Sequence, residues 1–454
     1  MLICMKRRTY IAAINILATA LLTTRLWAST IRNFKVSQHL DDASLAPPPW
    51  SSCTTSADCA FNGECVKTRR DNEQDPEATG QCRCFPGWIG PTCEVLDTLP
   101  SLGGLRLPNH TSSWGGSVAY DAVSNRYHMF ASEIVNGCGL YDWTTNSRVI
   151  RATSASPYGS YMKEQVIVPV FAHDANVIRA PTGEWVLFVT ARKGVVPKDC
   201  RQANRFETST LPTSIGITEK EETPPKDTYM LWADQPQGPW SSPVMVLNST
   251  EYNSDFWNKT NRTAKCDSNL NGIILNDNSL VGLWRKCETP ELLTIPHLLT
   301  ATDWKNASTY VPHYQQQLFP LAGSGAEDPS NVWATKTTDM KPHQIALHVL
   351  FHDEQATRCM LGACGGTGRH AVALWDTSQH NSSLATGAWR YSTWNAYDRN
   401  VAFGDGKVLR SDTRARPHVI LDPSTQQPMA LSTGVKETSL SGYSWTVVTP
   451  LRTT

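Results

Sequence analysis

Short apolar runs separated by turn residues repeat along most of the chain. In one clear case, the runs 177–180 and 185–188 flank the turn Pro181-Thr182-Gly183. Apolar runs of this length, bounded by Gly, Pro, Asn or Asp, are typical of β-hairpins. The same composition predicts further hairpins over residues 118–130, 273–283 and 419–431. The pattern therefore predicts an all-β chain.

A short polar motif precedes each of these hairpins, and five copies are spread over the last three quarters of the chain. Three copies contain acidic residues: His173-Asp174-Ala175-Asn176, Cys266-Asp267-Ser268-Asn269 and Glu327-Asp328-Pro329-Ser330. Two flanking copies have no acid: Trp114-Gly115-Gly116-Ser117 and Ala415-Arg416-Pro417-His418. Five copies suggest five similar sheets. If those sheets surround one axis, carboxylates that are distant in sequence converge on one pocket.

The fold class that fits this pattern is all-β, with a five-bladed β-propeller over residues 100–454. A propeller is favoured because radial sheets leave few exposed edges. The motifs are spaced more widely than the usual propeller period, and we expect long loops, such as 195–228 and 250–265, to account for the excess. A β-sandwich or a jelly roll is the structural alternative.

The first residues are typical of a targeting segment. Lys6, Arg7 and Arg8 precede the apolar stretch 10–22, which predicts a signal peptide over residues 1–28 or an uncleaved signal anchor. A cleaved signal peptide predicts a protein that is secreted or in the lumen of the secretory pathway. An uncleaved anchor predicts a type II membrane protein. Six glycosylation sequons agree with export, and they begin at Asn109, Asn248, Asn258, Asn261, Asn306 and Asn381.

The charge balance argues against a nucleic-acid partner. Lys plus Arg and Asp plus Glu both total 41, so the chain carries no net positive field. Tryptophan is frequent, at 16 residues, which favours aromatic-lined grooves. The sequence gives no reason to expect a cofactor. His343, His348 and His352 are unevenly spaced along one expected strand, so we expect no metal site there.

Six cysteines define a small module over residues 53–93, after a Pro-containing linker over residues 29–52. The segment from Cys82 to Cys93 resembles the end of an epidermal-growth-factor-like (EGF-like) module. That resemblance implies three pairs: Cys53–Cys65, Cys59–Cys82 and Cys84–Cys93. Because so short a segment cannot build a core, the bridges must carry its fold. The acidic residues that calcium-binding members carry are missing before Cys53, so we expect no calcium; a spacer is favoured over an adhesion unit for a protein partner.

The remaining cysteines also suggest disulfides. One of the thirteen cysteines, Cys4, lies in the targeting segment, which leaves an even number for pairing in an oxidising compartment. Cys266 is expected to pair with Cys287, and Cys359 with Cys364. Cys138 and Cys200 either pair with each other or stay unpaired.

The acidic motifs resemble the sheet starts of the five-bladed propeller glycosidases of glycoside hydrolase family 43. Asp174 precedes Ala175, Asp267 precedes Ser268, and Glu327 stands two residues before Pro329, in the order and at the offsets of that family's motifs. The resemblance implies that Asp174 acts as the base, Asp267 as an orienting residue and Glu327 as the acid. The family's proline is absent after Asp174 and Asp267, and Asp328 is an alternative to Glu327 as the inward carboxylate.

The chemistry of an inverting glycosidase explains why such residues would be needed. One carboxylate activates a water and one carboxylic acid protonates the leaving oxygen. Clustered carboxylates raise one another's pKa, which keeps the acid protonated. Residues of the same and neighbouring motifs are expected to shape the pocket and bind the sugar: Trp114, His173, Asn176, Asn269, Asp328, His370, Arg416 and His418.

Two functional hypotheses follow from the sequence. The first is an exported glycoside hydrolase that acts on arabinose- or xylose-type glycans. The second is a catalytically inactive propeller that binds a glycan or a protein through the same pocket. A structural role also competes with both, because Asp and Asn at strand starts commonly bond to their own backbone.

Overall fold

The computed structural model describes residues 52–67, 80–201, 226–249, 268–288, 293–313, 318, 326–353, 367–378, 389–392, 394–436 and 442–453. The predicted targeting segment and the predicted linker up to residue 51 lie outside these ranges, as do Asp267, Cys266, Cys359, Cys364, Asn258, Asn261 and Asn381. Of Glu327 and Cys287 only the place in a strand is described. In the described part, no helix is both long enough and apolar enough to span a membrane.

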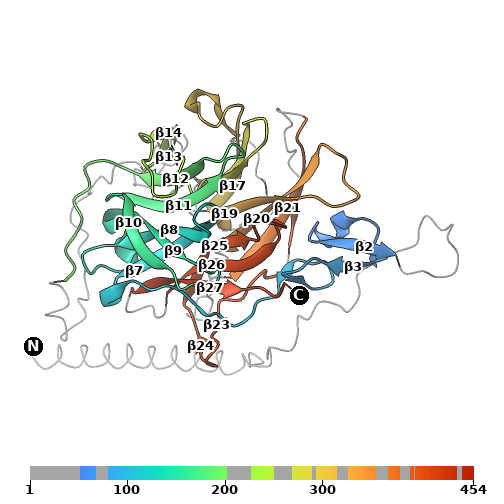
Figure 1. The fold of residues 1–454 in the computed structure, drawn as a ribbon, viewed down its shortest axis with the longest axis horizontal. Coiled ribbons are helices and arrows are strands. Elements are labelled where there is room, and N and C mark those ends of the chain that lie inside the picture. Colours follow the sequence, from blue (N-terminus) through green and yellow to red (C-terminus); the bar gives the residue numbers. More distant parts are fainter. Residues whose placement is uncertain are drawn as a thin grey trace, which may run out of the picture. The chain divides into compact units, whose positions relative to one another are not determined.

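The predicted all-β class is confirmed: the described residues form five four-stranded antiparallel sheets (Figure 1). Sheet 1 contains β7 (Ser112–Asp121), β8 (Arg126–Ile134), β9 (Ser147–Ser154) and β10 (Met162–Val168). Sheet 2 contains β11 (Ala172–Arg179), β12 (Trp185–Ala191), β13 (Asp227–Ala233) and β14 (Val244–Leu247). Sheet 3 contains β15 (Asn271–Ile274), β16 (Leu280–Glu288), β17 (Leu293–Ala301) and β18 (Tyr310–His313). Each predicted hairpin is present.

Sheet 4 contains β19 (Ala326–Thr335), β20 (Gln344–Asp353), β21 (Thr367–Asp376) and β22 (Trp389–Tyr391). Sheet 5 contains β25 (Thr413–Leu421), β26 (Pro428–Lys436), β27 (Ser444–Pro450) and, from much earlier in the chain, β6 (Gly103–Leu105). The smaller elements are β1 (Ser52–Cys53), β2 (Gly63–Lys67), β3 (Gly80–Cys84), β4 (Trp88–Ile89), β5 (Val95–Leu96), β23 (Val401–Ala402), β24 (Val408–Leu409), α2 (Trp143–Asn146) and the 3₁₀ turns η1 (Ser56–Cys59), η2 (Pro108–His110), η3 (Leu140–Asp142) and η5 (Ala307–Thr309).

The first strands of the five sheets contact one another in a closed circle. β7 contacts β11, β11 contacts β15, β15 contacts β19, β19 contacts β25, and β25 contacts β7 again. This arrangement of the described sheets is consistent with a propeller. Neighbouring sheets also share apolar cores, as where Phe188 of sheet 2 packs in one cluster with Trp284 of sheet 3.

One polar side chain from each first strand bonds to the backbone of the next sheet and so links the circle. Ser117 Oγ accepts a hydrogen bond from Val177 N at 2.8 Å. The other four links join Asn176 Nδ2 to Leu270 O at 3.0 Å, Asn271 Oδ1 to Val332 N at 3.3 Å, Asn331 Oδ1 to Val419 N, and His418 Nε2 to Val118 O at 3.1 Å. Because these groups are buried, each loss leaves a backbone group without a partner.

One residue of each motif has a left-handed backbone conformation, with positive φ: the second residue in four motifs and the fourth in the motif that ends at Asn269. These residues are Gly115, Asp174, Asn269, Asp328 and Arg416, with φ of 66°, 59°, 46°, 54° and 58°. In four of the sheets the residue lies at an irregularity of the first hairpin's register. A bulge of this kind redirects a side chain, and here it separates the residue that links the sheets from the left-handed residue.

The cysteine-rich module packs against sheets 4 and 5. The three predicted pairs are confirmed as the disulfides Cys53–Cys65, Cys59–Cys82 and Cys84–Cys93. The module does not rely on them alone: Trp88 lies in one apolar cluster with Trp333 of sheet 4, and Glu94 pairs with Arg390 at 3.4 Å. The small module therefore borrows part of its core from the sheets.

The alternative that the sequence left open for Cys138 and Cys200 is settled, since they form a disulfide across 62 residues. Among the predicted glycosylation sites that the structure describes, Asn109 and Asn306 are exposed and Asn248 is half-buried.

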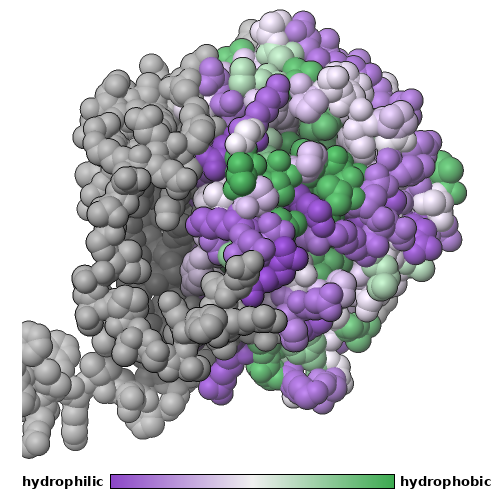
Figure 2. Space-filling model, turned by 90° about the vertical axis from the view of Figure 1, so that its left-hand side faces the viewer, coloured by the Kyte–Doolittle hydropathy of each residue, from purple (hydrophilic) through white to green (hydrophobic). Residues whose placement is uncertain are grey.

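On the face shown in Figure 2, hydrophobic residues lie in small groups among polar ones. The outermost strand β10 contributes two exposed apolar side chains, Met162 and Val166.

We predict that the links between sheets are major contributors to stability. Asn176→Ala removes the donor to Leu270 O and should lower the free energy of unfolding by about 1–3 kcal/mol, measured by urea denaturation. Asn176→Asp should be at least as harmful, since a carboxylate then faces a carbonyl, whereas Asn331→Asp keeps an acceptor for Val419 N. The exposed substitution Lys341→Ala is the control. Equal stability of Asn176→Ala and the control would contradict the prediction.

Candidate active site

Four motif residues from four sheets meet at the centre of the circle. Arg416 Nη1 lies 2.5 Å from Asp174 Oδ1, and Arg416 Nε lies 3.0 Å from Asp328 Oδ1. The backbone N–H of Arg416 also donates to Asp328 Oδ2 at 3.2 Å. Asn269 Nδ2 donates to the other oxygen of Asp174, Oδ2, at 2.8 Å. One guanidinium thus bridges two carboxylates that stand 154 residues apart in the chain, from position 174 to position 328.

All of these side chains are shielded from solvent. The side chains of Asp174, Asp328 and Arg416 are 1%, 3% and 9% exposed. Burial of charge without a partner is very costly, so the guanidinium is what makes two buried carboxylates tolerable. Two carboxylates against one guanidinium leave a formal excess of one negative charge, and the neutral amide of Asn269, which donates to Asp174, shares it. This is an electrostatically organised site.

Positive φ at Asp174, Asn269 and Asp328 is readily tolerated, because short polar side chains bond locally in this conformation. Arg416 has no such advantage, and a strained backbone at a non-glycine residue costs of order 1–3 kcal/mol. Strained residues are often found at functional sites. The ion pairs of Arg416 with Asp174 and Asp328 offset that cost in this chain.

The cavity at the centre is narrow. Its volume is about 10 Å³, roughly the space for one water. Its walls include Trp114, Asn176 and His418, together with the carboxylate of Asp174 and the guanidinium of Arg416. Trp114 is 7% exposed, and its ring lies so close to Gly434 that a Cβ there would come within 2.6 Å of it.

Most of the predicted site residues are therefore brought together. Trp114, Asn176, Asp174, Arg416 and His418 line the central cavity. Asn269 and Asp328 bond to the two residues that dominate it, and His173 Nε2 lies 3.1 Å from Asp174 Oδ1. The residues at the position equivalent to Asp174 are Asn269 in sheet 3 and Asp328 in sheet 4, each with positive φ.

For two predicted residues the structure does not describe the side chain, and a third lies away from this group. Asp267 lies outside the described residues. Glu327 pairs in register with His352 between β19 and β20. His370 is fully buried and lies elsewhere, with its Nε2 at 3.0 Å from His348 Nδ1 and its ring beside Trp88 of the cysteine-rich module.

Two serines of sheet 1 were not found by sequence reasoning. Ser132 Oγ accepts a hydrogen bond from Asp174 N at 3.3 Å, and Ser147 Oγ lies 2.7 Å from His173 Nδ1. Neither serine lies in a motif. Each comes from a second or third strand, β8 or β9, and only the packing of sheet 1 on sheet 2 brings them to the site.

Comparison with known proteins gives distant likenesses to solved structures. No family model and no curated protein sequence matches the chain. The structures that resemble it include Zg3597, a family 117 glycoside hydrolase of the marine bacterium Zobellia galactanivorans, with 11% identity and a TM-score of 0.44 over 80% of this chain and 91% of that one.

Two further structures are an endo-arabinase from Bacteroides thetaiotaomicron and the α-L-arabinofuranosidase PaAbf62A from Podospora anserina. The endo-arabinase has 10% identity and a TM-score of 0.43, covering 78% of this chain and 97% of its own. PaAbf62A has 11% identity and a TM-score of 0.43, covering 81% and 98%. These likenesses are too distant to support a conclusion about activity, which has to be judged from the residues of this chain.

We predict that Arg416→Gln destabilises the protein strongly. The substitution keeps the side-chain stem but leaves Asp174 and Asp328 without their shared cation, which should cost about 3–5 kcal/mol, measured by chemical denaturation. The control is Arg452→Ala, whose exposed pairing with Asp97 should be worth less than about 1 kcal/mol. A loss no larger than that of the control would show that the central charges are not coupled.

We also predict a loss of stability below neutral pH from the buried histidines of sheet 4. Burial lowers the pKa of His370 to about 3, and burial with the neighbouring His370 lowers the pKa of His348 well below its ordinary value. The unfolded chain takes up these protons near pH 6.5, whereas the folded chain does not. The stabilisation is therefore complete above that pH and falls on acidification, by about 2 kcal/mol per histidine at pH 5.

Unfolding free energies measured at pH 7.5 and pH 5.0 test this. His370→Phe should reduce the difference between the two pH values, while His110→Gln, at an exposed histidine, should leave it unchanged. An identical difference in wild type and His370→Phe would rule out the proposed linkage.

Proposed function

We propose that this protein is a glycoside hydrolase of the secretory pathway that acts at the centre of the circle of sheets. The observation that carries the proposal is the convergence of Asp174 and Asp328, from separate sheets, on the single guanidinium of Arg416. The proposed fold is a five-bladed β-propeller with an N-terminal EGF-like module. The resemblance of the acidic motifs to those of glycoside hydrolase family 43 supports this proposal.

In this proposal Asp174 is the general base. An ion pair with a guanidinium favours the charged form of a carboxylate, and a base must be charged to take a proton from water. The carboxylic acid that protonates the leaving oxygen is Glu327, with its neighbour Asp328 as the alternative. We propose an inverting reaction, since it needs two carboxyl groups and no covalent intermediate, on arabinose- or xylose-type glycans.

A second candidate is a catalytically inactive protein that binds a glycan or a protein partner. One observation favours it: the central cavity has room for about one water, so a sugar ring needs side chains to move before it can enter. The cysteine-rich module would then be the unit that contacts a protein partner, or a spacer.

Export is part of the proposal, whether by secretion or by a retained membrane anchor. The three disulfides of the cysteine-rich module and the Cys138–Cys200 bridge support it, because disulfides persist in oxidising compartments. Glycosylation at the exposed Asn109 and Asn306 is expected to follow.

The test is hydrolysis of a panel of nitrophenyl glycosides and of arabinan and xylan by the protein produced in a eukaryotic secretion host. Asp174→Asn and the acid variant, Glu327→Gln or Asp328→Asn, should each lower kcat by about 10²–10⁴-fold. Asp405→Asn, at an exposed turn pair with Lys407, is the matched control and should keep full activity. Binding to a polysaccharide without turnover would favour the second candidate, and equal activity in Asp174→Asn would remove Asp174 as the base.

A further inference from the structure

The imidazole of His173 lies between a serine and the proposed base. Its Nδ1 is 2.7 Å from Ser147 Oγ, and its Nε2 is 3.1 Å from Asp174 Oδ1. All three residues are buried. The contacts cross from sheet 1 to sheet 2, since Ser147 opens β9 and His173 lies in β11.

The charge of Asp174 selects one tautomer of His173. A carboxylate oxygen 3.1 Å from Nε2 attracts an N–H and repels a nitrogen lone pair, so the hydrogen on the ring belongs on Nε2. In the neutral ring Nδ1 is then an acceptor, and the Ser147 hydroxyl donates to it. The serine thus fixes which tautomer of the histidine faces the carboxylate.

The ring is also held in place from the side. Trp143 stacks on His173, with ring centres 4.6 Å apart and planes at 25°, and Lys226 Nζ lies 4.0 Å from the centre of the Trp143 ring. Charged groups near His173 in the described part of the chain include Asp174, Arg416 beyond it, and Lys226 across Trp143.

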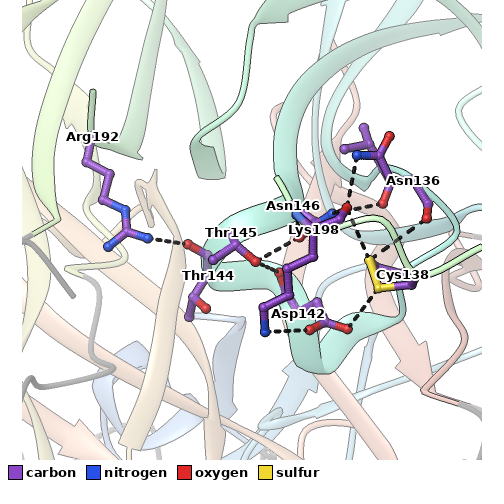
Figure 3. Close-up of polar contacts among 10 residues, drawn as sticks. Asn136, Cys138, Asp142, Thr144, Thr145, Asn146, Arg192 and Lys198 are labelled. Atoms are coloured by element: carbon purple, nitrogen blue, oxygen red, sulfur yellow. Dashed lines mark hydrogen bonds and ion pairs between the residues drawn. A yellow bond between two sulfur atoms is a disulfide. The ribbon is translucent and has the colours of Figure 1, made fainter. Parts of the chain in front are cut away.

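Trp143 belongs to the short helix α2, and a dense set of polar contacts fixes that helix (Figure 3). Asn146 Nδ2 donates to Lys198 O at 2.8 Å, Lys198 Nζ pairs with Asp142 at 3.2 Å, and Arg192 Nη2 donates to Thr144 O at 3.0 Å. The Cys138–Cys200 disulfide ties the same two segments together. The segment 136–146 is thereby held against His173.

We propose that Ser147 and His173 are positioning residues for Asp174, acting as a relay in which the Ser147 hydroxyl bonds Nδ1 and so holds Nε2–H facing Oδ1. With Asn269 on Oδ2 and Arg416 on Oδ1, this relay fixes the rotation of the carboxylate. The proposal rests on the proposed function for its catalytic meaning, but the hydrogen-bond arrangement exists independently of turnover.

The first test is direct observation of the His173 tautomer. Nitrogen-15 NMR of the full-length protein labelled at histidine, with the His173 signals identified by their loss in His173→Gln, should show the Nε2–H tautomer at neutral pH. In Ser147→Ala the Nδ1 resonance should shift, because its hydrogen-bond donor is gone. A wild-type ring protonated only on Nδ1, or an unchanged Nδ1 resonance in Ser147→Ala, would overturn the relay.

The second test is kinetic, on whichever glycoside the wild type hydrolyses. Ser147→Ala should lower kcat by up to about 100-fold with KM little changed, since a small displacement of a reacting group has effects of that size. Ser147→Thr restores the hydroxyl and should recover kcat and the wild-type dependence of kcat on pH. Thermal unfolding of each variant checks that it folds. Full activity in Ser147→Ala would overturn the positioning role.

The two tests separate the two proposals. If the wild type hydrolyses nothing in the panel while the Nε2–H tautomer and its dependence on Ser147 are observed, the proposed hydrolysis fails and the relay stands. If hydrolysis depends on Asp174 but the tautomer is the other one, the relay fails and the proposed function stands.

Discussion

Closure of the circle of sheets is the constraint on which the rest of this structure depends. Each first strand must present a polar atom to the backbone of the next sheet while its own backbone turns toward the centre. The chain meets both needs within three or four residues, with a left-handed residue that points inward and a Ser, Asn or His that reaches sideways. The centre is therefore crowded with polar side chains because the links that close the circle place them there.

The buried charges follow from this constraint. The carboxylates of Asp174 and Asp328 would repel each other in a dry interior and destabilise the fold. Their ion pairs with Arg416 offset that cost. The same ion pairs narrow the central cavity, so the arrangement that stabilises the carboxylates also restricts access to them. Any ligand that enters must supply contacts that compete with the guanidinium.

Much of the fold could be predicted from the sequence. The spacing of the short apolar runs, the turn residues and the repeated motif all indicate hairpins that begin at polar residues. The cysteine pairs of the small module were readable for a similar reason, since their spacing resembles a known module. It was harder to predict which residue of each motif takes the same position in its sheet. In sheet 3 the left-handed residue is Asn269, two positions after the acidic residue Asp267, so the acidity of a residue does not reveal which position of the motif takes the left-handed conformation.

Contacts between sheets could not be predicted at all. Ser132 and Ser147 carry no signature, and their place beside Asp174 and His173 comes from how β8 and β9 pack on β11. His370 was grouped with the site on the strength of its residue type. Its environment is instead an aromatic cluster with Trp88 and Trp333. This cluster depends on the packing of the cysteine-rich module against the sheets, which the motif pattern does not predict.

The last sheet is assembled from both ends of the described chain, since β6 pairs with β27. During synthesis on a ribosome, residues 103–105 emerge long before residues 444–450 exist, so β6 has to wait for a partner that is made much later. Sheet 5 therefore cannot be completed until β27 has been made, and the earlier sheets must be kept from associating wrongly in the meantime. For such a protein, the chaperones of the compartment where it folds matter as much as the sequence itself.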